Sequence, residues 1–558
     1  MLLQQKIWAV IFGAILMAST TATPVVDLGY SQYQGSVNAT TKIATFLGIR
    51  FAAAPLGDLR FRAPQAPENI TGVQEATTQP NQCFQAGSGT SPTNPLEARA
   101  VDVATSEDCL FLSVSLAYTT QVTQKAFRLA HSPVIVWIHG GGYLSGAASM
   151  YRGSDLIAQS NRGIVVVTIQ YRLGVFGFLP GAEVKQNGAL NAGLRGNLAF
   201  VSCLYLLNLT RIVVDQDFAL RWVNKHISKF GGDPSKVVIW GESAGAGSVL
   251  QHIVANNGQT KPQLFRGAIT SSTFLPSQYH YNDRIPELVY NEVVAQTNCS
   301  SAADSLACLR KADVNALETA NININAAAFF GTWTVVPVVD GEFITQRPTL
   351  SLAQGKVNGK ALLSVTNTFE GTSLVDQSTA ATANATQYAL DLFPNFGAAQ
   401  ANKVGALYAG LGTPIFQTNA IQGESILICP TYFLLRAFAG RSFKGEFAIL
   451  PGLHSQDVEY YFPSLLVDFP GIATRNFNST AFIDAFAQSF TSFAISLDPN
   501  IKVNPYTITP KWNKWNLGET EMLFNKTDAD VPVVHPVKTS DALLERCQFW
   551  LSVGDLTG

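Results

Sequence analysis

The segment from Val237 to Leu250 reads VVIWGESAGAGSVL and contains a Gly-x-Ser-x-Gly motif centred on Ser243. In a nucleophile elbow this motif joins a strand to a helix, and its glycines let neighbouring backbone pass close while the serine takes a strained conformation. Apolar residues precede and follow the motif here, which predicts a short strand, a sharp turn and a helix. The sequence therefore predicts that Ser243 is a nucleophile; the alternative is a tight glycine-rich turn without chemistry.

Acyl transfer also needs hydrogen-bond donors for the developing oxyanion, and a glycine-rich segment upstream can supply them. Residues 137–143 read WIHGGGY and follow a run of β-branched residues. Bare backbone N–H groups in such a loop, together with those at the start of the helix after the serine, can point into one site. We expect the donors to be the N–H groups of Gly141, Gly142 and Ala244; a flexible loop is the alternative for the glycines.

A serine hydroxyl needs a general base, and the chain has seven histidines. His454, in PGLHSQDVEYYF, lies in a loop that leads into aromatic residues, whereas His139 belongs to the glycine loop and is expected to shape it. Where such an elbow occurs, the chain order is serine, acid, histidine. Glu370, in LLSVTNTFEGTSL, ends a β-rich run. We therefore expect Glu370 to orient His454, with a surface glutamate as the alternative.

The segments around these residues alternate between strands and helices. SPVIVWIHGGGY (132–143) and RGIVVVTIQYRLG (162–174) are apolar, β-branched runs that lead into loops, which indicates buried strands. The segment 217–232 has an apolar helical stripe and ends on glycine. The stripe consists of Ala219, Leu220, Val223, Ile227 and Phe230. This alternation predicts an α/β fold with a mainly parallel sheet and helices on both faces.

The composition is typical of a well-buried globular protein. The chain has 558 residues, 47% of them hydrophobic, and a formal net charge of −2. This balance gives no reason to expect nucleic acid or an anionic membrane as a partner. No repeat or low-complexity linker marks a boundary, so we expect residues 23–558 to form a single domain.

The N-terminus is typical of a secretory signal. Lys6 precedes an apolar run over residues 7–18, and small residues follow. The run is too short to span a bilayer, so we expect residues 1–22 to be removed and the protein to be secreted, with a membrane anchor as the alternative. An exported protein is expected to carry disulfides and glycans. Asn-x-Ser/Thr sequons occur at Asn38, Asn69, Asn208, Asn298, Asn384, Asn478 and Asn525.

Further motifs follow in an order that resembles the type-B carboxylesterase/lipase family, which includes cholinesterases and fungal lipases. They are FLGIRFAAAPLGDLRF, SEDCLFLSV, HGGGY, FGGDPSKVVIWGESAGAGS, PVVDGEF, NTFEGTS and HSQDVEYYF. The resemblance runs from about Tyr30 to the C-terminus. It implies an α/β-hydrolase fold, in which insertions form a gorge and a small lid-like loop. It also implies the triad Ser243, Glu370 and His454, with the oxyanion donors named above.

The same resemblance implies three disulfides among the seven cysteines. Cys83–Cys109 would close the lid-like loop, Cys299–Cys308 a small loop, and Cys429–Cys547 would join distant segments. Each would contribute roughly 2–4 kcal/mol of stability. Cys203 is left over.

Two features bear on the substrate. Residues 84–108 contain no tryptophan, whereas cholinesterases use one in this loop to stack on a quaternary ammonium. A choline ester is therefore not expected as the dedicated substrate, and the short loop favours an esterase or a lipase with a small lid. Phe329, Phe330 and Trp333 are candidates for the wall of an apolar acyl or alcohol pocket, with ordinary core packing as an equal alternative.

Residues 196–214 also depart from the family. Without them the chain reads NAGLRDQDFALRWV, which resembles the sequence of the family in this region. The possible codons at both ends of the segment and within it include a splice donor, a branch point and an acceptor, and joining the ends regenerates an aspartate codon. Our hypothesis is that the segment is a retained intron; a genuine insertion is the alternative.

The sequence thus predicts a secreted carboxylic-ester hydrolase that works through an acyl-enzyme without metal or cofactor. The expected partner is a small-molecule or lipid ester, with no nucleic acid and no integral membrane span. The acyl chain length, the alcohol and the oligomeric state are left open, so a short-chain esterase competes with a lipase or sterol esterase. An adhesion or binding module on the same fold is the alternative class, and the presence of all three triad residue types argues against it.

Overall fold

The computed structural model describes residues 23–91, 105–118, 131–194, 215–468 and 475–557. The expected signal segment, residues 92–104 of the expected lid-like loop, and the segment 196–214 with Cys203 lie outside the described residues. Within those five ranges, no helix is both long enough and apolar enough to cross a membrane.

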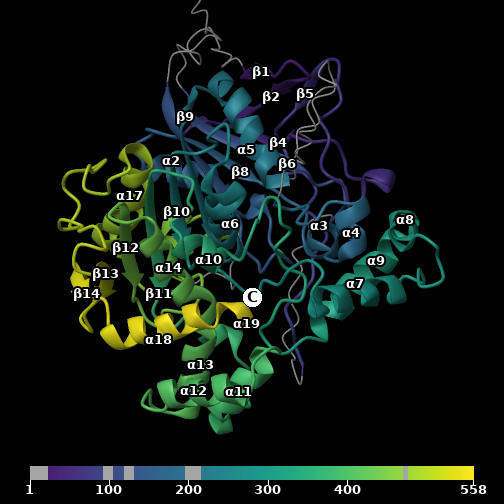
Figure 1. Cartoon of the computed structure of the whole chain (residues 1–558). Coiled ribbons are helices and arrows are strands. Elements are labelled where there is room, and N and C mark those ends of the chain that lie inside the picture. Colours follow the sequence, from purple (N-terminus) through teal and green to yellow (C-terminus); the bar gives the residue numbers. More distant parts are fainter. Residues whose placement is uncertain (1–22, 92–104, 119–130, 195–214, 469–474, 558) are drawn as a thin grey trace, which may run out of the picture.

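An eleven-stranded sheet forms the centre of the molecule (Figure 1). Its strand order is β14-β13-β12-β11-β10-β9-β7-β8-β6-β4-β3. The pairs from β8 through β7 to β13 are parallel, and the pairs at both edges are antiparallel. A second, three-stranded sheet has the order β1-β2-β5. The strands are β1 Val25–Asp27, β2 Gln32–Gln34, β3 Ser36–Val37, β4 Ile43–Arg50, β5 Val73–Glu75, β6 Phe111–Ala117, β7 Ser132–Ile138, β8 Val165–Ile169, β9 Gly232–Glu242, β10 Gly267–Ser271, β11 Ala361–Asn367, β12 Ser442–Phe447, β13 Thr520–Lys526 and β14 Pro532–Lys538.

Helices cover both faces of the large sheet. Helices α6 and α14 contact it on one side, and α2 and α17 contact it on the other. The α-helices are α2 Gly153–Gln159, α3 Gly174–Phe178, α4 Ala182–Asn187, α5 Asp215–His226, α6 Ala244–Gly258, α7 Arg284–Gln296, α8 Ser305–Lys311, α9 Val314–Ala326, α10 Pro348–Ala353, α11 Ala385–Leu392, α12 Ala398–Tyr408, α13 Pro414–Gly423, α14 Cys429–Ala437, α15 Val458–Tyr461, α16 Leu465–Asp468, α17 Thr480–Ser496, α18 Asp541–Ser552 and α19 Gly554–Thr557.

The two faces explain the unbroken apolar runs of the central strands. In β7, Val134 and Val136 belong to the core under one layer of helices, while Ile135 and Trp137 belong to the core under the other. A strand buried on both sides gains from apolar residues at every position. The predicted α/β fold is therefore confirmed, including the strands at β7 and β8.

The predicted helix after the insertion is present as α5, and a 3₁₀ turn, Ile227–Phe230, extends it. All five residues of its predicted stripe are buried. The element ends at Gly231, whose φ of 82° is left-handed. A glycine adopts this conformation without steric cost, which is why it terminates helices so often.

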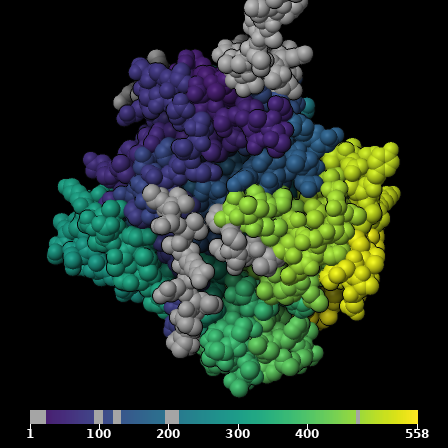
Figure 2. All heavy atoms as spheres, turned by 180° about the vertical axis from the view of Figure 1, so that it is seen from behind, coloured from purple at the N-terminus to yellow at the C-terminus, as the bar shows by residue number. Residues whose placement is uncertain are grey.

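Two helical units project from the sheet core. In Figure 2 the teal unit α7–α9 forms one bulge and the green unit α11–α13 forms another. Disulfides join the three cysteine pairs named above. Cys299–Cys308 lies within the first unit, just before and inside α8, and Cys429–Cys547 ties α14 to α18.

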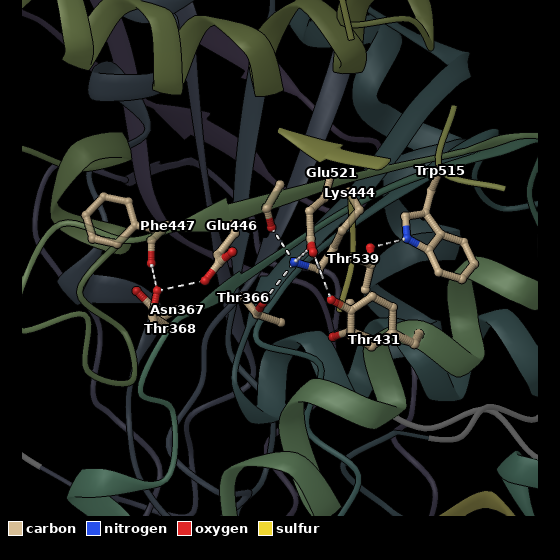
Figure 3. Close-up of polar contacts among 12 residues, drawn as sticks. Thr366, Asn367, Thr368, Thr431, Lys444, Glu446, Phe447, Trp515, Glu521 and Thr539 are labelled. Atoms are coloured by element: carbon tan, nitrogen blue, oxygen red, sulfur yellow. Dashed lines mark hydrogen bonds and ion pairs between the residues drawn. The ribbon is translucent and has the colours of Figure 1, made fainter. Parts of the chain in front are cut away.

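A buried ion pair fixes the sheet where β11, β12 and β13 meet (Figure 3). Lys444 is fully buried, and its Nζ lies 2.9 Å from a carboxylate oxygen of Glu521. It also donates to Thr366 Oγ1 at 2.9 Å and to a backbone carbonyl. A buried charge is costly unless it is paired and hydrogen-bonded, and these contacts supply both for Lys444 and link the three strands. The loops that follow β11 and β12 carry Glu370 and His454.

Candidate active site

Ser243 lies between β9 and α6, as the elbow motif predicts. Its backbone has φ 55° and ψ −125°, which is a strained conformation for a residue with a side chain. A Cβ at Gly241 would overlap the backbone of Gly245, and a Cβ at Gly245 would overlap the carbonyl of Ile138 in β7. The two glycines therefore permit the tight packing that holds the strained serine in place.

Ser243, His454 and Glu370 form one chain of hydrogen bonds. The Ser243 Oγ lies 2.9 Å from His454 Nε2, and His454 Nδ1 lies 2.6 Å from Glu370 Oε2. Ser243 comes from the end of β9, and the other two come from the loops after β11 and β12. The carboxyl ends of parallel strands meet at one edge of the sheet, so residues distant in sequence are brought together.

Glu370 is fully buried, and its second oxygen has partners of its own. Glu370 Oε1 accepts hydrogen bonds from Ser272 Oγ at 2.6 Å and from the backbone N–H of Asn367 at 2.7 Å. These donors compensate the buried carboxylate and fix its orientation. The sequence predictions did not include Ser272, which belongs to none of the motifs, or Asn367, which begins the NTFEGTS motif but acts on Glu370 through its backbone N–H.

The environment of His454 determines its basicity. Burial alone lowers the pKa of His454, but the hydrogen bond and charge of Glu370, with the charges of Glu242 and Asp457, outweigh burial and raise the pKa to about 9. In the neutral imidazole that the reaction needs, Nδ1 carries the proton and donates to Glu370, while Nε2 accepts from the Ser243 hydroxyl. This is the arrangement of a general base next to a nucleophile.

Two further buried carboxyl groups surround the histidine. Glu242 Oε1 lies 3.5 Å from His454 Nε2 and accepts a hydrogen bond from Ser455 Oγ. Burial raises the pKa of Glu242 to about 7 and that of Asp457 to about 6. Asp457 accepts hydrogen bonds from Asn367 and from another buried side chain, Tyr461. These two carboxyl groups were not predicted from the sequence, although Glu242 lies inside the elbow motif itself.

The glycine loop after β7 lies directly against the serine. A Cβ at Gly140 would lie only 3.0 Å from the Cβ of Ser243. Gly141 and Gly142 have φ of 104° and 64°, which favour glycine. The N–H groups of Gly141, Gly142 and Ala244 donate to no other residue in the described part of the chain. Three donors are thus unpaired beside the serine hydroxyl.

His139 has the supporting position that the sequence suggested. Its ring is buried and stacks on Tyr171, with 4.5 Å between ring centroids. Burial lowers its pKa to about 4, so the ring is neutral near pH 7. The Tyr171 hydroxyl donates to the His139 carbonyl at 2.8 Å. These contacts fix the loop that carries Gly141 and Gly142.

The three aromatic residues expected near a pocket lie in different places. The Trp333 indole packs against Gly142, where a Cβ would overlap its Nε1, and against Phe274 at 4.8 Å between centroids. Phe329 packs on Tyr388 of α11 at 5.7 Å. Phe330 pairs through its backbone with a residue of the lid-like loop, Ser91. Only Trp333 therefore directly borders the glycine loop among these contacts.

The chain is similar to a known protein family over most of its length. The model of the carboxylesterase family covers residues 22–396, which is well over half of the chain. The chain belongs to the carboxylesterase family. The resemblance deduced from the motifs is thereby confirmed.

Individual members of the carboxylesterase family are similar to this chain over different lengths. Secreted lipase 1 of Botryotinia fuckeliana is 33% identical over 380 residues, and the match spans 64% of this chain and 62% of that protein. The pyrethroid hydrolase Ces2e of Rattus norvegicus is 36% identical, and the match spans 56% of it. The chain thus spans less than two thirds of these two relatives. Carboxylesterase patB of Aspergillus clavatus is 28% identical, with 96% and 97% of the two chains covered.

The fold is also similar to a solved structure. The crystal structure of EstA from Aspergillus niger superposes with a TM-score of 0.80 at 29% identity. The match covers 97% of this chain and all of EstA. The large, mainly parallel sheet flanked by helices is therefore an α/β-hydrolase fold, as predicted.

Proposed function

We propose that this protein is a secreted carboxylic-ester hydrolase in which Ser243, His454 and Glu370 form the catalytic triad. The observation that carries the proposal is the hydrogen-bonded chain from Ser243 Oγ through His454 to the buried Glu370 carboxylate. Its position beside three unpaired N–H groups supplies the second requirement of acyl transfer.

The reaction follows from the geometry. The Ser243 hydroxyl attacks the ester carbonyl, and His454 Nε2 takes its proton while Gly141, Gly142 and Ala244 donate to the oxyanion. Glu370 holds the imidazole and stabilises the imidazolium. His454 then protonates the leaving alcohol, and an acyl-enzyme remains. Water then attacks the acyl carbonyl while His454 takes its proton, and the bond to Ser243 Oγ breaks as the imidazolium returns a proton to that oxygen. The carboxylic acid is released and the free serine is restored. These residues need no metal or cofactor for any step.

Secretion is supported by three independent features. The apolar N-terminal run is typical of a signal, three disulfides favour an oxidising compartment, and a relative is named a secreted lipase. We infer that residues 1–22 are removed and that residues 23–558 form one domain. The segment 196–214 remains a hypothetical retained intron. Mass spectrometry of the mature secreted protein would test both inferences through its N-terminal peptide and the peptide across Asp215.

Hydrolysis of p-nitrophenyl esters from acetyl to palmitoyl tests the activity. The substitution Ser243→Ala should lower kcat by about 10⁶-fold, while Ser235→Ala, at an exposed serine of the same strand, should leave it unchanged. The chain-length optimum distinguishes a short-chain esterase from a lipase or sterol esterase. A folded protein that hydrolyses no ester in the series would instead favour a binding module.

A further inference from the structure

The backbone of the glycine loop turns back on itself between Gly140 and Gly146. The Gly141 carbonyl accepts hydrogen bonds from the N–H groups of Leu144 at 3.0 Å and Ser145 at 2.9 Å. Gly146 then returns so close to the start of the turn that a Cβ there would lie 2.5 Å from the Gly140 carbonyl oxygen. Its φ of 94° lies in the left-handed region that favours glycine. The position of Gly146 therefore fixes the turn that carries the expected oxyanion donors.

One side chain holds Gly146 through both of its backbone groups. The Gly146 N–H donates to Gln85 Oε1 at 3.1 Å, and Gln85 Nε2 donates to the Gly146 carbonyl at 3.2 Å. Among the described residues, no backbone group forms a hydrogen bond with Gly146. The Gln85 amide thus supplies the donor and the acceptor that a neighbouring strand would supply elsewhere.

Further hydrogen bonds on either side of Gln85 hold its segment along the glycine loop. Gln85 Nε2 also donates to Gln82 Oε1 at 3.1 Å, and Gln82 Nε2 donates to Ser149 Oγ at 3.0 Å. The N–H of Ala86 donates to the Leu144 carbonyl at 2.8 Å. These contacts fix the orientation of the Gln85 amide, so that it can fix the loop in turn.

A disulfide anchors the same segment to the large sheet. Cys83 stands two residues before Gln85 and is bonded to Cys109, which lies just before β6. Both cysteines are buried, and β6 pairs with β4 and β8. Gln85 is therefore attached to a rigid part of the fold, as a side chain must be if it is to hold another segment in an exact place.

We propose that Gln85 is a positioning residue for ester hydrolysis, which holds the glycine loop through Gly146 and keeps the N–H groups of Gly141 and Gly142 directed at the oxyanion. Gln85 acts through the loop and not on the substrate. This role rests on the proposed function, because only a reaction that forms an oxyanion needs these donors. Misplacement of a group by about 1 Å in such a site can cost about 10²-fold in rate.

The substitution Gln85→Met tests this role, because methionine has a similar length but forms neither hydrogen bond. Stopped-flow release of p-nitrophenol from p-nitrophenyl butyrate gives the dissociation constant of the ester and the rate constant of acylation separately. We expect the rate constant to fall by about 10–100-fold. The dissociation constant should change less than twofold, since the bound ester has no oxyanion yet. Gln346→Met is the matched control, because Gln346 is also partly buried and its amide donates to Ser351 and Gln354; both constants should stay within twofold.

A trifluoromethyl ketone with a hexyl chain tests the oxyanion donors themselves. The Ser243 Oγ adds to its carbonyl carbon, the hydroxyl proton passes to His454, and the carbonyl oxygen becomes an oxyanion. The inhibition constant should rise in Gln85→Met by about the factor by which acylation slows, and it should stay unchanged in Gln346→Met. A substitution that only destabilised the fold would reduce the amount of active enzyme and leave this constant unchanged.

Hydrogen exchange of single amides in the unsubstituted protein keeps the test independent of turnover and of how well Gln85→Met folds. The Gly146 N–H should exchange at least tenfold more slowly than an unprotected amide, although no backbone carbonyl of the described residues accepts from it. An unprotected Gly146, an unchanged acylation rate in a folded Gln85→Met protein, a loss confined to the dissociation constant of the ester, or an unchanged inhibition constant would each overturn the proposal. If the unsubstituted protein hydrolyses no ester, the proposed function fails; if it does and only the Gln85 results differ, the positioning role alone fails.

Discussion

Glu242 Oε1 lies 3.5 Å from His454 Nε2, the same nitrogen that faces the Ser243 hydroxyl. A carboxylate at this distance favours the protonated imidazole and so helps to raise the pKa of His454. It also favours the imidazolium that forms during attack by the serine. The residue that precedes the nucleophile therefore affects both the resting state and the reaction.

The pH dependence of kcat/KM should report this relationship. Attack needs the neutral imidazole, so the rate should rise with pH, and its midpoint should lie above 6.5 because the pKa of His454 is raised. Glu242→Gln removes one negative charge and should move the midpoint to lower pH. Glu545→Gln, an exposed glutamate in α18, serves as the control. A midpoint that does not move in Glu242→Gln would contradict the electrostatic role.

Glu370→Gln should lower kcat by about 10³–10⁴-fold, because an amide in place of the carboxylate neither favours the correct tautomer nor stabilises the imidazolium. Ser272→Ala removes only one of the two donors to Glu370 Oε1, since the Asn367 N–H remains. We expect a loss of about tenfold there. Steady-state kinetics of both variants give the comparison. Equal losses of kcat in the two variants would contradict a larger contribution of the Glu370 carboxylate than of the Ser272 hydroxyl.

Gly142→Ala should lower kcat/KM by about 10²–10³-fold, because the new Cβ would overlap Trp333 and shift an oxyanion donor. Gly355→Ala is a close control, since that glycine has the same φ of 64° and nothing within 4 Å of a Cβ. It should cost roughly 1 kcal/mol of stability from backbone strain alone. Urea unfolding and ester hydrolysis should separate the two effects; a control as inactive as Gly142→Ala would count against the oxyanion role.

Loss of Cys429–Cys547 should destabilise the protein more than loss of Cys299–Cys308. The two bridges span 118 and 9 residues, and the entropy of loop closure predicts a difference of about 2 kcal/mol. Double cysteine-to-alanine variants, compared by urea unfolding, give the two free energies of unfolding. The reverse order would indicate that packing around the bridges in the folded protein, rather than the entropy of the unfolded chain, determines the loss of stability.

Deletion of residues 196–214 should give a folded, active protein. The Asp215 N–H donates to the Ala192 carbonyl at 3.1 Å. In the shortened chain these two residues stand four positions apart, which is the spacing of an α-helical hydrogen bond. Asp215 also keeps its buried ion pair with Arg172. Sequencing of transcripts and hydrolysis by the deletion variant check this. An insoluble or inactive deletion variant, or messages that all contain the segment, would rule against the retained intron.

Much of this architecture was predictable because its signals are local. Unbroken apolar runs and glycines located β7, β9 and α6, and the elbow and glycine loop follow from such short stretches. Glu242, Ser272 and Asp457 were not predicted as parts of the site. Their importance comes from burial and from distances to His454, which depend on how β9, β10 and the loop after β12 pack together.

Covalent labelling with diethyl p-nitrophenyl phosphate, followed by peptide mass spectrometry, tests directly whether Ser243 is the nucleophile. We expect one adduct, on Ser243, that forms in step with loss of ester hydrolysis. The adduct should be absent from Ser243→Ala and should form far more slowly in His454→Gln. Loss of hydrolysis without a label on Ser243, or labelling of another serine such as Ser455, would contradict the assignment of Ser243 as the nucleophile.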